Sequence, residues 1–348
     1  MTSLHHLFLL GRPLGPLYGL AMRLRAALYS ADVFTRQSMP VAVISVGNLV
    51  LGGSGKTPMV RYLAELLLAM GLRPAIVSRG YGGTMREQAA VVSDGRSLLL
   101  SPQQGGDEPA MLARALPQVP VVIGRRRLHP CRLAIDRLNA NVLILDDGFQ
   151  HLAVRRNLDL VLFDGSTLAG DGRVFPAGIL REPMSALCRA DAVVLTGITA
   201  SNREGAEDFA ALVRRRHPAL PVFFVSLARP SLRFESGAPP QSGPFFAFCG
   251  IANPERFSDT VRSMGLIPSG TLKLPDHVHY SPELLAEICT RATACGATWL
   301  LTTAKDAVKL HDLPRSLPLG IIEIALASTP QFDLFLGQRL QDISGTAH

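Results

Sequence analysis

The sequence predicts an α/β fold with a mainly parallel sheet and helices on both of its faces. Short β-branched and apolar segments recur along the chain, which is typical of strands buried on both sides. Helical or irregular stretches separate them, as expected where crossover helices join parallel strands. A glycine-rich turn also joins the first predicted strand to an amphipathic helix. The predicted strands span residues 41–46, 74–78, 119–123, 141–145, 158–163, 192–196 and 222–227.

The first predicted helix follows the glycine-rich turn and runs from Pro58 to Met70. Its apolar side chains recur at helical spacing, which places them on one face. Proline suits the first turn of a helix, and Gly71 suits its C-terminal end. We therefore expect this helix to pack against the sheet.

A second, smaller α/β unit is predicted beyond residues 228–243, a stretch rich in Pro, Gly and Ser that suits a linker. Its predicted strands are 245–249, 298–302 and 321–326, and a helix is expected to begin near Asn253. The chain is long enough for two domains. The expected division is an N-terminal segment 1–30, a core domain 31–228, and a C-terminal α/β domain 229–348 that contributes to the active-site cleft.

Composition excludes some classes of protein. A hydrophobic content of 47% in 348 residues argues against disorder. Five cysteines, an odd number without a CxxC pair, predict reduced thiols rather than a disulfide framework. The net charge of +7 suits a nucleic acid, an anionic membrane surface or a phosphorylated substrate. Aromatic residues make up only 6%, which leaves few surfaces for stacking bases.

Residues 1–30 are apolar and basic and contain no acidic residue. Arg12, Arg23 and Arg25 interrupt the apolar run, so it is too short to span a bilayer. The segment also lacks the ordered pattern of a signal peptide. It predicts an amphipathic, membrane-associated helix, with an ordinary helix packed on the domain as the alternative.

The strongest single motif is GGSGKT, which lies between a predicted buried strand and a predicted helix. In this context the motif predicts a P-loop, whose backbone N–H groups and helix N-terminus bind phosphate. Lys56 would reach the β- and γ-phosphates, and the Thr57 hydroxyl would ligate Mg²⁺. The P-loop pattern expects glycine at position 50, where this chain has Val50. The predicted ATP-binding residues are Gly52, Gly53, Ser54, Gly55, Lys56 and Thr57.

Acidic residues at two places are candidates for chemistry. The predicted strand 141–145 ends in Asp146 and Asp147, which with Thr57 are the expected Mg²⁺ ligands. Which of the two carboxylates would touch the metal stays open. Asp107 in the GGDEP stretch precedes a predicted helix, either as its N-cap or as a catalytic carboxylate. His277 lies in a PDHVHY stretch, which allows a metal ligand, a proton relay or a structural histidine.

Further polar residues follow other predicted strands. Parallel sheets place ligand sites at the carboxyl ends of their strands. Arg181, in a GILREP loop, would stabilise a transferring phosphate or simply lie on the surface. Three arginines at 125–127 would add positive charge at another strand end. The residues expected to contact the acceptor substrate are Ser78, Arg79, Tyr81, Gln150 and His151.

Taken in order, these motifs resemble the tetraacyldisaccharide 4′-kinases, the lipid A 4′-kinases of Gram-negative bacteria. The joint occurrence of the stretches is far more specific than a P-loop alone. They extend from Ile44 to Lys309, most of the chain. Members of this family also have Val-type residues where the first P-loop glycine is expected. The matching stretches are ISVGNLVLGGSGKTP, VSRGYGG, GGDEP, LDDGFQH, FPAGILREP, PDHVHY and TAKDAVK.

The resemblance implies transfer of the γ-phosphate of MgATP to the 4′-hydroxyl of a tetraacylated glucosamine disaccharide 1-phosphate, forming lipid IVA. It implies monotopic association with the cytoplasmic face of the inner membrane and no nucleic-acid partner. Ala304 stands where family members often have Glu, so that side chain is not needed here. The catalytic residues it implies are Asp107, His277, Lys56, Arg181 and Asp147.

Two other classes of function stay open at this stage. A P-loop NTPase acting as a switch or a metal-insertion chaperone would carry similar loops and strand-end acids but need no lipid surface. It would form a nucleotide-dependent partner complex without a phosphorylated small product. A nucleic-acid-binding module rests only on the charge of +7.

Overall fold

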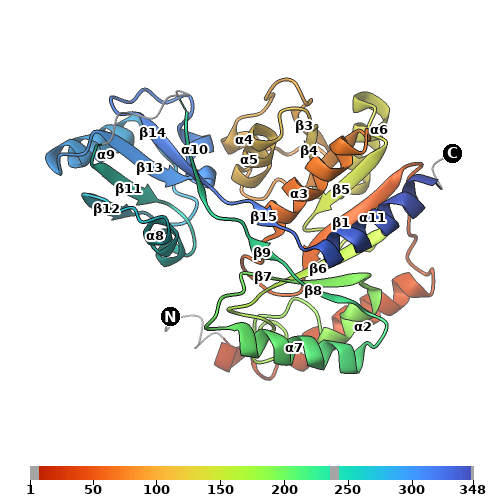
Figure 1. Cartoon of the computed structure of the whole chain (residues 1–348). Coiled ribbons are helices and arrows are strands. Elements are labelled where there is room, and N and C mark those ends of the chain that lie inside the picture. Colours follow the sequence, from red (N-terminus) through yellow and green to blue (C-terminus); the bar gives the residue numbers. More distant parts are fainter. Residues whose placement is uncertain (1–7, 236–242, 346–348) are drawn as a thin grey trace.

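The computed structural model describes residues 8–235 and 243–345. Two sheet-containing units lie side by side and are connected by the short strands β9 and β15 (Figure 1). The large unit holds an eight-stranded sheet in the order β3-β4-β2-β5-β1-β6-β7-β8. Its strands are β1 Ala42–Asn48, β2 Pro74–Ser78, β3 Ala90–Ser93, β4 Val121–Ile123, β5 Val142–Asp146, β6 Leu158–Asp164, β7 Ala192–Thr196 and β8 Val222–Phe224.

The predicted mainly parallel α/β sheet is confirmed. Every pairing in the large sheet is parallel except that of the edge strand β3 with β4. The central strands are fully buried, as their continuous apolar sequences predict. The helices of this unit are α2 Gly15–Ser30, α3 Lys56–Ala69, α4 Pro102–Gly105, α5 Asp107–Ala115, α6 Leu128–Leu138, the 3₁₀ helix η1 Met184–Arg189, α7 Arg203–Arg216 and α11 Pro330–Gly345.

Helices cover both faces of the large sheet. Apolar side chains of α3, α5 and α11 share one core with β1, β2 and β6. On the opposite face, α6 packs on β2 and β5, and α7 packs on β6 and β7. Both layers leave the carboxyl ends of the strands free for the loops that follow them.

The small unit contains a five-stranded sheet in the order β10-β14-β13-β11-β12, in which β10 alone is antiparallel to its neighbour. Outside it, β9 Ser226–Leu227 pairs with β15 Leu326–Ala327. The elements of the small unit are β10 Ser231–Phe234, β11 Phe245–Cys249, α8 Pro254–Ser263, β12 Gly270–Lys273, α9 Pro282–Ala294, β13 Trp299–Thr303, α10 Ala304–Leu310 and β14 Leu319–Glu323.

Several elements differ in detail from the prediction. Residues 231–234 lie inside the expected linker but form β10, because Leu232 and Phe234 pack in the small core. Residues 236–242 of that stretch lie outside the described residues. The predicted strands 222–227 and 321–326 each divide into two, since the chain leaves one sheet and joins the β9–β15 pair. Strands β3 and β12 were not predicted.

Among the described residues, no helix combines the length and apolar character needed to cross a bilayer. The N-terminal helix α2 has 16 residues and docks through small ones. A Cβ on Gly15 would lie 2.6 Å from the Cβ of Ala177, so only glycine permits this close approach. Residues 1–7 lie outside the described part of the chain.

All five cysteines are free thiols. Three of them are buried and two are exposed. The expectation of reduced cysteines therefore agrees with the structure.

Candidate active site

The glycine-rich loop joins β1 to α3 at the carboxyl edge of the large sheet. Strand ends fix it from two sides: Asn48 Nδ2 donates to Ser54 Oγ at 2.9 Å, and Thr196 Oγ1 donates to the Ser54 carbonyl at 3.1 Å. Gly52 and Gly55 have φ angles of 107° and 77°, a region that favours glycine. A Cβ on Gly52 or Gly53 would meet no atom within 4 Å, so the outer side of the loop is open to a ligand.

Asp147 gathers the two cations expected at this edge. Its Oδ1 lies 3.5 Å from Lys56 Nζ, and Arg181 Nη1 contacts both carboxylate oxygens at 2.8 and 2.9 Å. Burial alone would raise the pKa of Asp147, but Lys56 and Arg181 hold it below its usual value. Its φ of 54° is unusual for a non-glycine residue, and such backbone strain often occurs at functional sites.

Asp146 is buried beside Asp147 and accepts a hydrogen bond from Ser78 Oγ at 2.9 Å. Burial, together with the negative charge of Glu108, raises the pKa of Asp146 to about 6. A bound cation would relieve both effects.

The buried Arg127 positions this acid pair. It is 2% exposed and donates to the Asp146 carbonyl at 3.1 Å and the Gly124 carbonyl at 3.0 Å. Burial lowers its pKa to about 10. The sequence predicts three arginines that add positive charge at a strand end. Arg125 and Arg126 are exposed there, but Arg127 is buried.

Asp107 and His277 come from the two units and meet across the boundary. Asp107 is the first residue of α5, and His277 lies in the loop between β12 and α9. Asp107 Oδ2 lies 3.1 Å from His277 Nδ1. His277 has a φ of 58°, a second strained non-glycine residue at the site. The pair expected to form between the two units is therefore in contact.

The TAKDAVK stretch contacts this pair through α10, a contact that its sequence alone does not predict. The Thr303 hydroxyl caps α10 by accepting from the Asp306 N–H at 3.1 Å. The fully buried Asp306 accepts from the Gly250 N–H at 2.9 Å and lies 3.3 Å from Lys309 Nζ. Lys309 in turn lies 3.6 Å from Asp107 Oδ2.

The residues expected to contact the acceptor lie around this edge, but not all are free. Ser78 is bonded to Asp146, while Arg79 and Tyr81 are exposed at the end of β2. Gln150 Nε2 donates to the Asn48 carbonyl at 3.0 Å. The Gln150 carbonyl accepts from Arg25 of α2 at 3.1 and 3.2 Å, which ties the N-terminal helix to this turn.

We predict that the His151 ring stays neutral between pH 5 and 8. Burial and the nearby Arg127 lower its pKa to about 3. Below pH ~6.5 the His151 ring takes up a proton in the unfolded chain but not in the folded protein. His151 therefore makes folding less favourable as the pH falls from ~6.5 towards 3. NMR of histidine-labelled protein, assigned with His151→Gln, checks this; a ring that titrates above pH 5 contradicts it.

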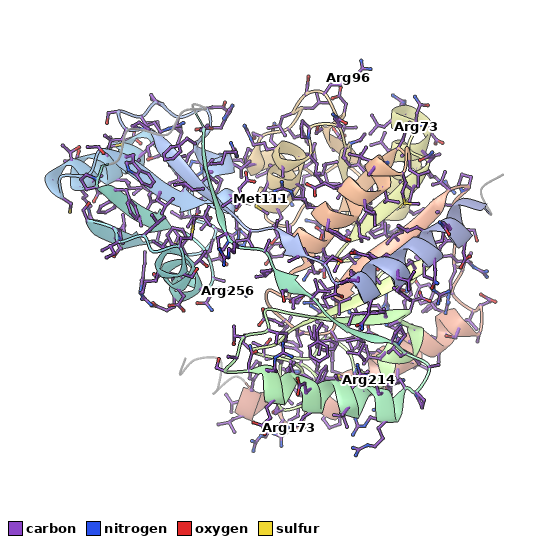
Figure 2. All side chains as sticks on the ribbon, viewed as in Figure 1. Arg73, Arg96, Met111, Arg173, Arg214 and Arg256 are labelled. Atoms are coloured by element: carbon purple, nitrogen blue, oxygen red, sulfur yellow. The ribbon has the colours of Figure 1, made fainter. Side chains whose placement is uncertain are left out.

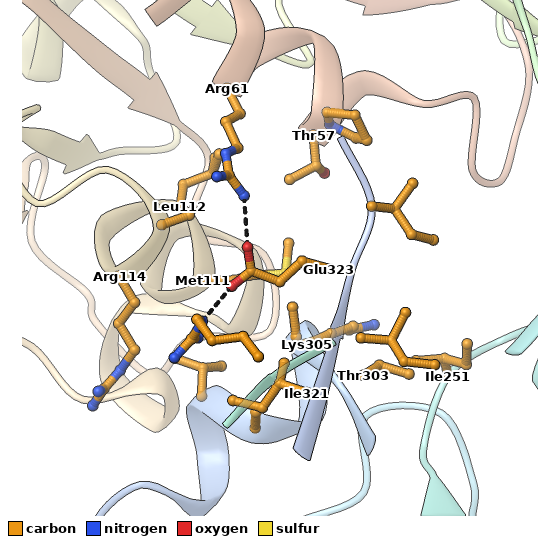
Figure 3. Close-up of a pocket in the computed structure, with 18 of the residues that line it drawn as sticks. Thr57, Arg61, Met111, Leu112, Arg114, Ile251, Thr303, Lys305, Ile321 and Glu323 are labelled. Carbon is orange, nitrogen blue, oxygen red and sulfur yellow. Dashed lines mark hydrogen bonds and ion pairs between the residues drawn. The ribbon is translucent and has the colours of Figure 1, made fainter. Parts of the chain in front are cut away.

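A cavity of about 760 Å³ lies between the two units, and Thr57 of the glycine-rich loop and Lys305 of α10 are among the residues that line it. Figure 3 shows Glu323 of β14 reaching into it between Arg61 of α3 and a second guanidinium. The distances are 3.2 Å to Arg61 Nη1 and 2.6 Å to Arg233 Nε. Met111 of α5 and Arg256 of α8, both labelled in Figure 2, also line this cavity. Of these two ion pairs, the one between Arg61 and Glu323 bridges the two units, and the one between Arg233 and Glu323 lies within the small unit.

The fold and the site define an α/β protein with a glycine-rich loop, paired strand-end carboxylates and an Asp–His pair formed between two units. The chain belongs to the Tetraacyldisaccharide-1-P 4′-kinase family, whose model matches residues 7–341.

Similar proteins of known name cover nearly the whole chain. The tetraacyldisaccharide 4′-kinase of Desulfotalea psychrophila is 46% identical over 318 residues, covering 90% of this chain and 91% of that protein. The one of Geobacter metallireducens is 43% identical, covering 91% and 92%. A crystal structure of LpxK from Aquifex aeolicus in complex with ATP matches with a TM-score of 0.78 at 29% identity, covering 97% of this chain and 99% of that one.

Proposed function

We propose that this protein transfers the γ-phosphate of ATP to the 4′-hydroxyl of a tetraacylated glucosamine disaccharide 1-phosphate, forming lipid IVA. Family membership over residues 7–341 identifies the kinase class. The observation that carries the mechanism is the 3.1 Å contact between Asp107 and His277 at the carboxyl edge that also holds the glycine-rich loop. The proposed proton acceptor and the proposed phosphate-binding loop would therefore act at one edge of the sheet.

The loop at 52–57 is proposed to act as the P-loop, with its open glycine side receiving the phosphates. Thr57, Asp146 and Asp147 suit Mg²⁺, since hydroxyl and carboxylate oxygens are the ligands this ion prefers. The raised pKa of Asp146 indicates a carboxylate that a cation would stabilise. When bound, Mg²⁺ would supply positive charge that offsets the negative charge of the phosphates.

In the transfer step, the oxygen of the sugar hydroxyl bonds to the γ-phosphorus, and Asp107 accepts the proton of that hydroxyl. Lys56 and Arg181, which rest on Asp147 in this structure, stabilise the charge of the phosphoryl group. The exposed Arg79 and Tyr81 lie where the acceptor would approach. The neutral ring of His151 offers a hydrogen bond but no acid–base chemistry near pH 7.

We further propose that α2 lies on the cytoplasmic face of the inner membrane. The glycines of α2 face the protein, and exposed leucines occupy the opposite side. Residues 1–30 contain Arg12, Arg23 and Arg25 and no acidic residue, a charge that suits anionic headgroups. Arg25 also connects this helix to the turn after Asp147, so a lipid-bound helix would hold the site near its substrate. The exposed leucines of α2 are Leu17, Leu20 and Leu24, and Leu9, Leu10 and Leu14 just before it are exposed as well.

Changing Leu17, Leu20 and Leu24 together to Gln is expected to lower partition into vesicles that contain anionic lipid by more than about tenfold. Each leucine that enters the acyl boundary contributes roughly 1.5 kcal/mol. Vesicle sedimentation measures the effect. The matched control is Ile267→Gln, an exposed apolar residue between α8 and β12 that should leave partition unchanged. Equal partition of all three proteins contradicts the proposal.

The proposed activity is tested by incubating the protein with γ-labelled ATP and the disaccharide lipid in detergent micelles. A labelled lipid is the expected product. ATP that binds but leaves the lipid unlabelled would favour the alternative, a nucleotide switch or metal-insertion chaperone. Nothing in the site favours a nucleic-acid partner, and we propose none.

The division into a segment 1–30, a core 31–228 and a C-terminal unit 229–348 remains part of this proposal. One helix of residues 229–348, α11, packs on the core domain instead of the C-terminal unit. Its Phe332, Leu336 and Leu340 are buried in the core of the large unit. Figure 1 shows α11 lying against that unit.

A further inference from the structure

The His277 ring is held from both sides, and these contacts determine which nitrogen carries its proton. Nδ1 lies 3.1 Å from Asp107 Oδ2, and Nε2 lies 3.3 Å from Lys305 Nζ. Asp276 Oδ2 lies 3.8 Å from Nε2, beyond hydrogen-bond distance, so the hydrogen bond of Nε2 is the one with Lys305. An ammonium group only donates hydrogen bonds, so Nε2 accepts in it. A neutral ring that accepts at Nε2 carries its proton on Nδ1 and donates it to Asp107.

Lys305 is itself fixed in place. Its Nζ lies 3.0 Å from Asp276 Oδ1, the oxygen that also accepts from the His277 N–H at 3.0 Å. It stands in the first turn of α10, which Thr303 caps, and its side chain is 17% exposed. Lys305, Asp276 and His277 therefore contact one another, and these contacts connect α10 to the 275–279 loop.

The contacts that hold Asp107 use one of its two carboxylate oxygens. Its Oδ2 faces His277 Nδ1 and also lies 3.6 Å from Lys309 Nζ. Within residues 8–235 and 243–345, both of these side-chain contacts use Oδ2 rather than Oδ1. A carboxylate held by one oxygen presents the other in a defined direction.

We propose that Lys305 is a positioning residue that fixes the Nδ1–H tautomer of His277. The ring then holds Oδ2 of Asp107 and leaves Oδ1 to accept the proton of the sugar hydroxyl. This inference rests on the proposed kinase function. In that step the hydroxyl oxygen bonds to the γ-phosphorus, the bond from the γ-phosphorus to the β,γ-bridging oxygen breaks, and ADP leaves. The proton passes to Oδ1 and later to water, so His277 keeps its own proton throughout.

The tautomer is measured directly by NMR of the full-length protein labelled with ¹⁵N-histidine, with His277 assigned by its loss in His277→Gln. We expect a protonated Nδ1 and an unprotonated Nε2. Lys305→Met should shift the ring towards the Nε2–H form, whereas Lys305→Arg, which keeps a donor, should preserve the wild-type form. An Nε2–H ring in the wild type, or an unchanged ring in Lys305→Met, overturns the proposal.

Kinetics provide the second readout. Lys305→Met should lower kcat by roughly 10- to 100-fold with little change in the KM for ATP, and Lys305→Arg should restore most of it. Lys273→Met is the matched control, because Lys273 pairs with Glu255 on the surface of the small unit. Unchanged signals from the other histidines show that the variant is folded. A kcat equal to the wild type overturns the proposal, while failure to phosphorylate lipid at all overturns only the kinase function and leaves the NMR result to decide the tautomer.

Discussion

Asp107→Asn is expected to lower kcat by about 100- to 10,000-fold while the KM for ATP changes little. The amide keeps the shape of the side chain but no longer accepts a proton. Asp107 belongs to α5 and not to the loop at 52–57 that would hold ATP, so nucleotide binding should survive. Steady-state kinetics and a separate ATP-binding titration measure the two effects.

Asp259→Asn is the matched control for this change. Asp259 is an exposed residue of α8 that pairs with Arg262, and its loss should alter neither parameter. A collapse of ATP affinity in Asp107→Asn, with kcat preserved at saturating ATP, would give Asp107 a role in nucleotide binding and remove it as the proton acceptor.

Lys56→Met is expected to lower kcat by roughly 100- to 1,000-fold, because it removes a positive charge aimed at the transferring phosphate. In contrast to Asp107→Asn, it should also weaken ATP binding. Asp147 would keep Arg181 as its partner, so the strand end should remain ordered. Kinetics with varied ATP separate the two variants.

The control for this second change is Lys273→Met, which removes a lysine from the surface of the small unit. A Lys56→Met protein with wild-type kcat and ATP affinity would contradict the assignment of residues 52–57 as the phosphate-binding loop. Wild-type ATP affinity with a lower kcat would limit Lys56 to the transition state.

Much of the fold is readable from the sequence, because strands buried on both faces leave continuous apolar runs. The runs around Val43 and Leu143 predict β1 and β5 in this way. Strand β12 has an alternating burial pattern and only four residues, so no such run marks it. Strand β10 lies among Pro, Gly and Ser residues that predict a linker. It forms a strand because it pairs with β14.

The site is predictable only in part, for a similar reason. The loop at 52–57 and the acidic pair at 146–147 are local patterns, so one short stretch of sequence is enough to predict each. The contacts of Arg127 with the Asp146 carbonyl and of Lys305 with His277 join distant segments. Neither residue type nor spacing carries that information, since it depends on how the loops and helices within each unit pack against one another.

The central claim is that this site transfers phosphate to one hydroxyl of a glycolipid. ³¹P NMR of a reaction mixture tests it most directly by following ATP, ADP and the lipid phosphates together. The account predicts one new phosphomonoester on the 4′ oxygen for each ADP formed, with the existing 1-phosphate unchanged. ADP and inorganic phosphate released at the same rate with and without lipid, and a lipid spectrum that never changes, would contradict it.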